Sequence, residues 1–147
     1  MSISGEPVSG GPDLAGRVRL MVVRLYRRVQ SEHARSALSG VQISALDSLS
    51  RFGPLTPREL AVCERVQPPT MTKLIASLEC DGLITRETHP KDRRQLILRV
   101  TAAGEQALAI AVRTTEEWLG KRLAELPEED RATVTAAVEV INKLAGG

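Results

Sequence analysis

The segment 68–81, PPTMTKLIASLECD, carries short hydrogen-bonding side chains at helical spacing. Its large apolar residues recur every three or four positions, so a helix would gather them on one inward face: Met71, Leu74, Ile75 and Leu78. The outward face keeps small or polar residues and a single cation: Thr70, Thr72, Lys73, Ala76 and Ser77. Such a face can approach the base edges of a DNA major groove and hydrogen-bond to them.

A second charged group follows in the segment 82–101. The runs 83–87 and 95–101 are predicted to be strands, and the turn between them holds cations around one carboxylate: Lys91, Asp92, Arg93 and Arg94. Four aliphatic residues are expected to fix these strands on the core: Leu83, Ile84, Leu96 and Leu98. A hairpin with a basic tip after a helix with a polar face is typical of a winged helix-turn-helix, whose tip lies over the neighbouring minor groove.

Short motifs in one order resemble the MarR family of bacterial transcription regulators over about residues 14–145: Leu60-Ala61, Pro68 to Thr72, Leu78-Glu79 with Gly82-Leu83-Ile84, Asp92-Arg93-Arg94, and Val100-Thr101 with Gly104. The resemblance implies a dimeric winged-helix regulator. The sequence departs from the family pattern at Glu64 and Arg65, where an apolar residue and a glycine are usual, and at Gln67, where a serine is usual. Positive φ at Arg65 would cost on the order of 1 kcal/mol, and Gln67 is a poor N-cap.

These patterns assign roles to individual residues. In the recognition helix we expect Thr70, Thr72, Lys73 and Ser77 to face the groove, with Pro69 touching thymine methyl groups or backbone. In the wing, the resemblance points to Arg94 as the side chain inserted into the minor groove. Lys91 and Arg93 are expected to contact phosphates, and Asp92 to hold the tip through an arginine and backbone N–H groups.

The rest of the chain is predicted to be helical. Thr56-x-x-Glu59 matches a capping box with Pro57 at the first helical position, and Leu55 before it is predicted to form a strand of one or two residues. Asp13 is the expected cap of the first helix, and Thr101 and Pro127 the expected starts of the last two. Amphipathic stripes place the helices at 13–35, 41–51, from 57, 102–126 and 127–145.

The chain of 147 residues is long enough for one domain, or for one that completes its core by pairing. The helices of both chain ends have more apolar surface than one winged domain covers, so we expect a homodimer. Net charge is +2, yet the segments 17–35 and 65–99 are basic and 116–139 is acidic, which suggests a polyanion on one side. We predict a mainly α fold divided into a disordered tail (1–12), dimerisation helices (13–35 and 102–145) and a winged helix-turn-helix lobe (36–101).

Other chemistry finds little support in the residues. Motifs for nucleophilic catalysis, phosphate loops and metal ligation are lacking, so we expect neither an enzyme nor a cofactor. Cys63 is expected to be buried on the inward side of its helix, and Cys80 to sit at a helix C-terminus that disfavours a thiolate. Apolar runs are too short for a membrane helix and no secretory signal stands at the start, so we expect a cytoplasmic protein.

Together these observations favour a dimeric, sequence-specific DNA-binding regulator that reads a pseudo-palindromic operator, and we expect a repressor. The resemblance implies release by a small aromatic or phenolic effector bound between the dimer helices and the DNA-binding lobe, with Tyr26, His33 and Trp118 as possible lining. Two alternatives stay open: a winged-helix module that binds protein without DNA, and a regulator that senses oxidants through cysteine.

Overall fold

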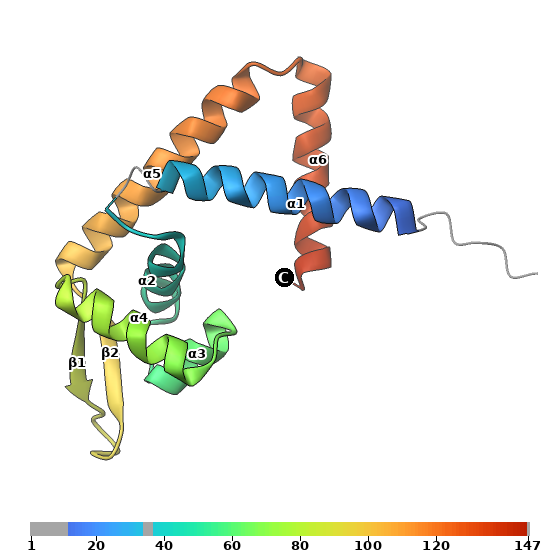
Figure 1. The fold of residues 1–147 in the computed structure, drawn as a ribbon. Coiled ribbons are helices and arrows are strands. Elements are labelled where there is room, and N and C mark those ends of the chain that lie inside the picture. The colour runs from blue at the N-terminus through green and yellow to red at the C-terminus, as the bar shows by residue number, and fades with distance from the viewer. Residues whose placement is uncertain (1–11, 34–36, 147) are drawn as a thin grey trace, which may run out of the picture.

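The computed structural model describes residues 12–33 and 37–146 (Figure 1). Its elements are, in order, α1 (Pro12–His33), α2 (Gly40–Phe52), α3 (Pro57–Glu64), α4 (Pro68–Cys80), β1 (Ile84–Thr88), β2 (Leu96–Val100), α5 (Ala102–Ala124) and α6 (Glu128–Ala145). The predicted fold class, mainly α with a β-hairpin wing, is confirmed. The predicted disordered tail lies outside the described residues, except that Pro12 already belongs to α1.

One core holds the lobe together. Its largest fully buried side chains come from every element between α2 and β2: Leu46, Leu60, Met71, Leu78, Ile84 and Leu98. The predicted inward stripe of α4 is buried throughout, so the opposite face of this helix is free to meet a ligand. Leu108 and Ala111 join the same core and tie the first half of α5 to the lobe.

Side-chain caps mark the starts of α2, α3 and α5. Thr56 and Glu59 form the predicted capping box of α3, and the Thr101 hydroxyl accepts the Gly104 N–H at the start of α5. Ser39 caps α2 in the same way with Gln42, which the sequence analysis missed. Asp13 is not the cap of α1, because the helix begins one residue earlier; its carboxylate lies in the first turn, where the helix dipole still favours it.

The hairpin forms the wing. β1 and β2 are antiparallel with Ile84 opposite Val100, and Leu55 bridges to Leu98 as the predicted short third strand. One expectation is wrong: Leu96 is 42% exposed, whereas Leu98 on the same side is fully buried. The reason is position, since Leu96 lies two residues nearer the tip, where the hairpin projects beyond the lobe (Figure 1).

The start of α5 approaches the wing closely at Gly104. A Cβ at this position would lie 2.2 Å from the Leu83 carbonyl oxygen, so Gly104→Ala should destabilise the fold by about 1–3 kcal/mol. Gly120 on the same helix is the matched control, because nothing lies within 4 Å of its Cβ position, and Gly120→Ala should stabilise by about 0.5–1 kcal/mol. Thermal unfolding of both variants tests the contrast, and equal shifts would contradict the close approach.

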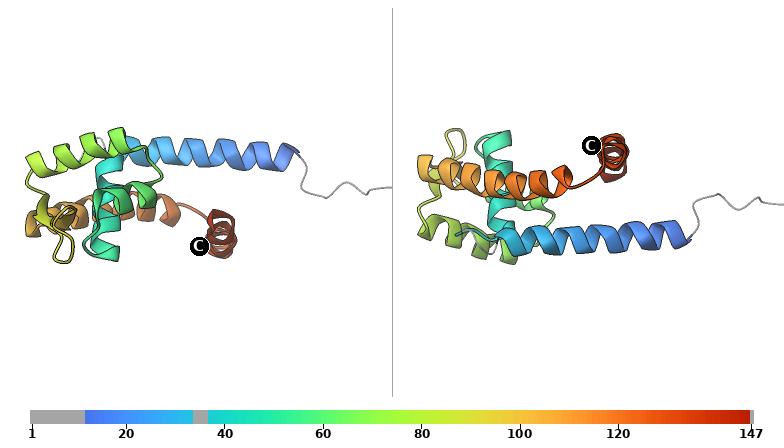
Figure 2. Two further views of the ribbon diagram at one scale, coloured as in Figure 1. Left: turned by 90° about the horizontal axis from the view of Figure 1, so that it is seen from below. Right: turned by 90° about the horizontal axis from the view of Figure 1, so that it is seen from above.

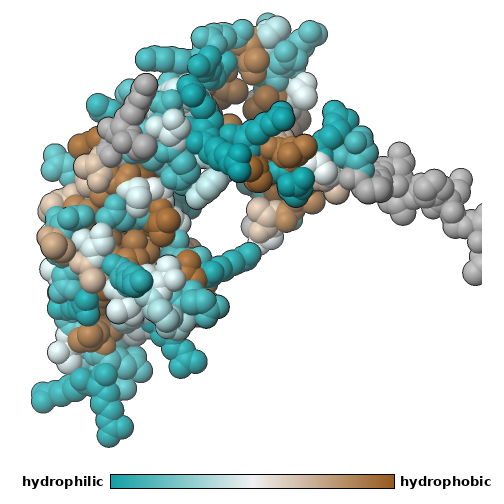
Figure 3. All heavy atoms as spheres, in the orientation of Figure 1, coloured by the Kyte–Doolittle hydropathy of each residue, from teal (hydrophilic) through white to brown (hydrophobic). Residues whose placement is uncertain are grey.

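The helices from the two chain ends form an arm beside the lobe. α1 packs against α5 near its own end and then projects away from the lobe, while α6 crosses α1 in Figure 1 but lies at a different depth in Figure 2. None of the α6 residues is buried. Brown, apolar surface lies along this arm in Figure 3. The exposed apolar side chains of α1 and α6 include Leu14, Leu20, Val22, Leu25, Val134, Val138 and Ile141.

Candidate nucleic-acid interface

The outward face of α4 presents the predicted reading residues. Pro69, Thr70, Thr72 and Lys73 are all exposed, and they lie in the first half of the helix. The Thr72 hydroxyl donates to the Pro68 carbonyl oxygen at 3.0 Å, so it offers a ligand its oxygen lone pairs and its methyl group. Ser77 is exposed as well, but its Oγ already accepts a hydrogen bond from Gln42 of α2 at 3.1 Å.

The turn before α4, whose shape the sequence left open, has an unusual backbone. Arg65 has φ 53° and ψ 40°, a left-handed conformation that glycine adopts without cost and a residue with a Cβ does not. Gln67 precedes the helix and makes no side-chain capping bond. The start of α4 is therefore held by backbone hydrogen bonds and its opening prolines, without a side-chain cap.

A carboxylate of α3 holds this turn from outside. Both oxygens of Glu64 accept serine hydroxyls from α2: Oε2 from Ser44 at 2.6 Å and Oε1 from Ser48 at 2.5 Å. The sequence analysis missed this cluster. The available signal was the spacing of the two serines by four residues, which puts both on one side of α2.

The tip of the wing is braced by its own side chains. Asp92 Oδ1 accepts the backbone N–H of Arg94 at 3.0 Å, and its carbonyl oxygen accepts that of Gln95. His89, which the sequence analysis left without a role, accepts the backbone N–H groups of Lys91 and Asp92 on Nδ1, both at 3.2 Å. Asp92 does accept a backbone N–H group as expected, whereas it forms no ion pair with an arginine of the described ranges. Lys91, Arg93 and Arg94 remain exposed around the braced turn.

Two further arginines fix the wing rather than extend the basic surface. Arg86 of β1 pairs with Glu79 of α4, and Arg99 Nε of β2 pairs with Glu87 Oε2 of β1 at 2.8 Å. The first pair joins the hairpin to the reading helix, and the second crosses the two strands. The cations left for an outside polyanion are therefore concentrated at the tip.

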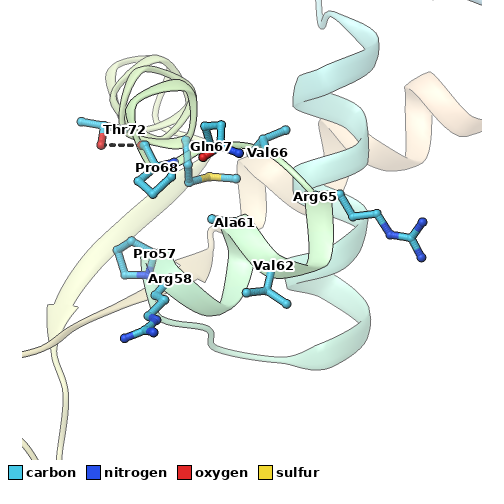
Figure 4. Close-up of a pocket in the computed structure, with 10 residues that line it drawn as sticks. Pro57, Arg58, Ala61, Val62, Arg65, Val66, Gln67, Pro68 and Thr72 are labelled. Atoms are coloured by element: carbon cyan, nitrogen blue, oxygen red, sulfur yellow. Dashed lines mark hydrogen bonds between the residues drawn. The ribbon is translucent and has the colours of Figure 1, made fainter.

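A hollow of about 790 Å³ opens between α3 and the first turn of α4 (Figure 4). Its floor is apolar and includes Ala61, Val66 and Met71, and Arg58 and Arg65 extend outward from its rim. Arg58 also lines a smaller hollow with Gln95 and Leu96 of the wing. It therefore lies between the reading helix and the hairpin, a place that the sequence analysis did not identify. The only signal was an arginine in the first turn of the preceding helix.

The three residues expected to line an effector site are not gathered in one place. His33 is buried, its Nε2 lies 2.6 Å from Thr115 Oγ1, and it lines a hollow of about 310 Å³ between α1, α2 and α5. Tyr26 is 59% exposed on the projecting part of α1. Trp118 stacks under the Arg28 guanidinium at 5.7 Å. The hollow is lined instead by residues that the sequence analysis did not select: Gly40, Ile43, Ser44, Asp47, Arg51, Val112, Thr115 and Glu116.

Both cysteines are exposed, so the expected burial of Cys63 is wrong. α3 is only eight residues long, and its inward positions are taken by Leu60 and Ala61. Cys63 lies near the C-terminal end of this short helix and is exposed. Among residues 12–33 and 37–146, no cluster of three or more histidines, cysteines and carboxylates is placed to hold a metal ion. No helix in the same ranges is long and apolar enough to cross a membrane.

Comparison with known proteins agrees with this geometry. A model of the MarR family matches residues 38–96. An uncharacterised HTH-type transcriptional regulator of Mycobacterium leprae is 40% identical over 131 residues, which cover 89% of this chain and 92% of that protein. A transcriptional regulator from Mycobacterium tuberculosis is 39% identical over 128 residues, covering 87% and 90%.

Solved structures show the same fold. A crystal structure of a protein from Pseudomonas aeruginosa PA01, assigned as a transcriptional regulator, matches with a TM-score of 0.81 and 30% identity over 95% of this chain and 98% of that one. Wild-type MarR from E. coli, in its apo form, matches with a TM-score of 0.74 and 21% identity over 86% and 95% of the two chains. The second likeness concerns the fold alone.

Proposed function

This chain belongs to the MarR family of winged helix-turn-helix transcription regulators, and we propose that it is a dimeric repressor that leaves its operator when a small ligand binds. One observation carries the proposal: a polar, exposed α4 face lies over a fully buried stripe, next to a wing whose cations are concentrated at a braced tip. A surface of this kind matches a major groove and the minor groove beside it.

Each exposed residue has a proposed part in DNA binding. Thr70, Thr72 and Lys73 read base edges, and Pro69 contacts thymine methyl groups or the backbone. Ser77 contributes least, because Gln42 occupies its oxygen and it lies in the second half of α4. Arg94 enters the minor groove, while Lys91, Arg93 and Arg58 contact phosphates. Residues 36–101 are the proposed DNA-binding lobe.

We assign dimerisation to residues 13–35 and 102–145. The exposed apolar side chains of α1 and α6 have no cover within the described chain, and such surfaces favour association. Charge is complementary as well, since Arg17 and Arg24 border the apolar stripe of α1 and the first turn of α6 carries three carboxylates. A two-fold dimer should read half-sites about 10–10.5 base pairs apart, or a multiple of that spacing.

Removing residues 127–147, which include α6, should abolish the dimer. We expect a monomer or an insoluble chain, because the apolar surfaces of α1 and α5 would lose their partner. Light scattering of the truncated and the full chain measures the difference. A replacement of Val134 and Val138 by serine in the full chain is the milder version and should weaken the dimer in proportion. A truncated chain that stays soluble, folded and dimeric would contradict the assignment.

The proposed effector site is the hollow that His33 lines. It lies between the arm and the lobe, so a ligand there can change the spacing of the two lobes in a dimer. An apolar wall with Ile43 and Val112 faces Thr115 and the Asp47–Arg51 ion pair, whose Nε–Oδ2 distance is 2.8 Å. Such a mixed lining suits a small aromatic or phenolic compound. Tyr26 and Trp118 are not part of this proposal.

Binding to the DNA that flanks its own gene tests the function. A gel shift at two salt concentrations should show a complex that resists competitor DNA and weakens steeply with salt, because the wing and Arg58 neutralise phosphates. A chain that dimerises but binds DNA only weakly and without sequence preference would favour the protein-binding alternative. The redox alternative predicts that mild oxidation abolishes the DNA complex and that a thiol restores it. It also predicts that a Cys63→Ser, Cys80→Ser protein keeps the complex under oxidation.

A further inference from the structure

The turn before α4, the proposed reading helix, is held by the carboxylate of Glu64, whose two oxygens both accept hydrogen bonds. Both oxygens of Glu64 accept a serine hydroxyl, at 2.6 Å and 2.5 Å. Hydrogen bonds from a hydroxyl to an ionised carboxylate are short at these distances and stronger than bonds between neutral groups. Ser44 and Ser48 lie one helical turn apart on α2, so together they clamp one side chain from one side.

The turn makes backbone hydrogen bonds of its own, from the Arg65 N–H to the Val62 carbonyl oxygen and from the Val66 N–H to the Ala61 carbonyl oxygen, but its side chains add no cap. Glu64 is the last residue of α3, Arg65 follows in a left-handed conformation, and Gln67 leaves the start of α4 without a side-chain cap. A left-handed residue with a Cβ persists only where its surroundings hold it. The bonds to Glu64 are the polar contacts that hold this stretch to the neighbouring helix.

The far end of the reading helix is fixed to the same helix. Gln42 Nε2 of α2 donates to Ser77 Oγ at 3.1 Å and approaches Asp81 Oδ2 at 3.5 Å. α2 therefore forms hydrogen bonds on both sides of α4. Gln42 contacts the C-terminal part of α4, and Ser44 and Ser48 contact Glu64 at the turn before α4. These polar contacts to α2 add to the packing of the buried stripe of α4 on the core.

α2 also forms a wall of the hollow between the arm and the lobe, and Ser44 belongs to both structures. It lines the hollow together with Ile43, Asp47 and Val112, and its hydroxyl is the one that reaches Glu64 Oε2. A molecule in the hollow would touch the residue that completes the clamp. No other serine of α2 has this double position among the contacts of the described residues.

We propose that Glu64 is a positioning residue for DNA binding, and that the Ser44–Glu64 hydrogen bond couples the hollow to the reading helix. The second half rests on the proposed function, which takes the hollow as the effector site. With the clamp intact, α4 is held in the pose that reads the operator. When the hollow is filled, Ser44 shifts, the clamp opens, and the reading helix loses its defined pose.

Operator affinity of clamp variants tests the positioning role. Glu64→Ala and Ser48→Ala should each weaken operator binding about tenfold, because a hydrogen bond to a charged group is lost. Glu64→Gln keeps one hydrogen-bond acceptor, so its operator affinity should lie between that of the two alanine variants and that of the unaltered chain. Affinity for non-specific DNA should not fall. Simple charge removal by Glu64→Ala would instead tighten all DNA binding, so the sign separates positioning from electrostatics.

Ser50→Ala is the matched control on the same helix, because the Ser50 hydroxyl donates to Glu105 Oε2 at 3.0 Å and touches neither the turn nor the hollow. It should leave operator affinity unchanged. Thermal unfolding shows that each variant is folded. Unaltered operator affinity in Ser48→Ala and Glu64→Gln, in a chain that does bind its operator, would overturn the positioning role and leave the proposed function intact. A chain without any specific DNA binding would overturn both.

Filling the hollow by mutation tests the coupling without knowledge of the effector. Val112→Trp, with Val112→Phe as the smaller version, places a ring in the hollow and should weaken operator binding. In a Ser44→Ala background the same change should have little further effect, because the link to Glu64 is already absent. Additive effects of the two changes, or a Val112→Trp chain that binds its operator as tightly as the unaltered one, would overturn the coupling.

Discussion

Replacing both Thr72 and Lys73 by alanine should weaken operator binding by about a hundredfold or more, since a good base contact is worth about 1–3 kcal/mol. Both residues are exposed in the first half of α4, opposite the buried face formed by Met71, Leu74, Ile75 and Leu78. The fold should be unaffected because neither side chain takes part in the core. Fluorescence anisotropy with the operator, and with single base-pair variants of it, measures affinity and base preference together.

Single changes separate the two parts of Thr72. Its hydroxyl hydrogen is committed to the Pro68 carbonyl oxygen, so the groups left for DNA are the oxygen lone pairs and the methyl group. Thr72→Ser keeps the first and Thr72→Val the second. If a thymine methyl is read, Thr72→Val should bind better than Thr72→Ser, and an acceptor contact predicts the reverse. Ser77→Ala, on the same helix but bonded to Gln42, is the control with the small effect.

An unchanged base preference in the double variant would remove α4 from the role of reading helix. The same helix could then only position the lobe on the backbone, and sequence would have to be read by the wing or through DNA shape. If the double variant lost the same affinity for the operator and for every base-pair variant of it, the effect would come from the Lys73 charge alone. The experiment therefore distinguishes base reading from electrostatic attraction on one surface.

Periodicity and capping were sufficient to predict the elements of the lobe. The stripe of α4 was predictable because residues three and four apart must share a face of any helix, and the caps at Thr56 and Thr101 because they satisfy N–H groups of their own first turns. The conformation of Arg65 stayed open in the sequence, because an arginine stands where the family usually has a glycine; the structure places it in the left-handed region at φ 53°.

The misplaced residues share one cause, which is that their surroundings come from distant parts of the chain. Leu96 repeats the pattern of Leu98, yet the lobe ends before it. Cys63 stands three residues after the buried Leu60, yet it is exposed near the end of α3. Tyr26 is 59% exposed on α1, and its part in an effector site stays a prediction. The spacing of apolar residues within one segment does not predict where the elements that pack against it end.

The clamp at Glu64 was hidden for a related reason. Its two donors stand 16 and 20 residues earlier, and a serine on an exposed helix face is ordinary. The departure from the family at this position was visible, but its partner was not. The structure shows that the substitution of an apolar residue by glutamate comes with hydroxyl donors on α2, so the local oddity is compensated by a contact that only the fold creates.

An ion pair and shared core contacts join the wing to α4, and this sets the expectation for Arg94. The Arg86–Glu79 pair ties β1 to α4, so an α4 seated in the major groove places the tip over the adjacent minor groove. Asp92 and His89 fix the tip backbone through its N–H groups. A guanidinium projecting from a fixed turn suits a narrow, strongly negative minor groove.

Arg94→Ala should therefore weaken operator binding sharply, by about tenfold or more, and reduce the preference for A·T pairs at the flanks of the site. Lys91→Ala, three residues away on the same turn, is the matched loss of one positive charge. It should weaken binding evenly across sequences and lower the slope of log affinity against log salt by about one. Titrations at several salt concentrations, on operators with A·T-rich and G·C-rich flanks, separate the two.

The direction in which Asp92→Ala changes DNA affinity decides between the two interpretations of the wing. The substitution removes a negative charge that phosphates repel, so electrostatics alone would tighten binding. It also removes the acceptor of the Arg94 N–H at 3.0 Å, so a tip that must be held in shape would bind less well. We expect the weaker binding, with His89→Ala acting in the same direction because it releases the N–H groups of Lys91 and Asp92. Tighter binding by Asp92→Ala, together with equal losses in Arg94→Ala and Lys91→Ala, would make the wing a diffuse positive patch and not a probe of the minor groove.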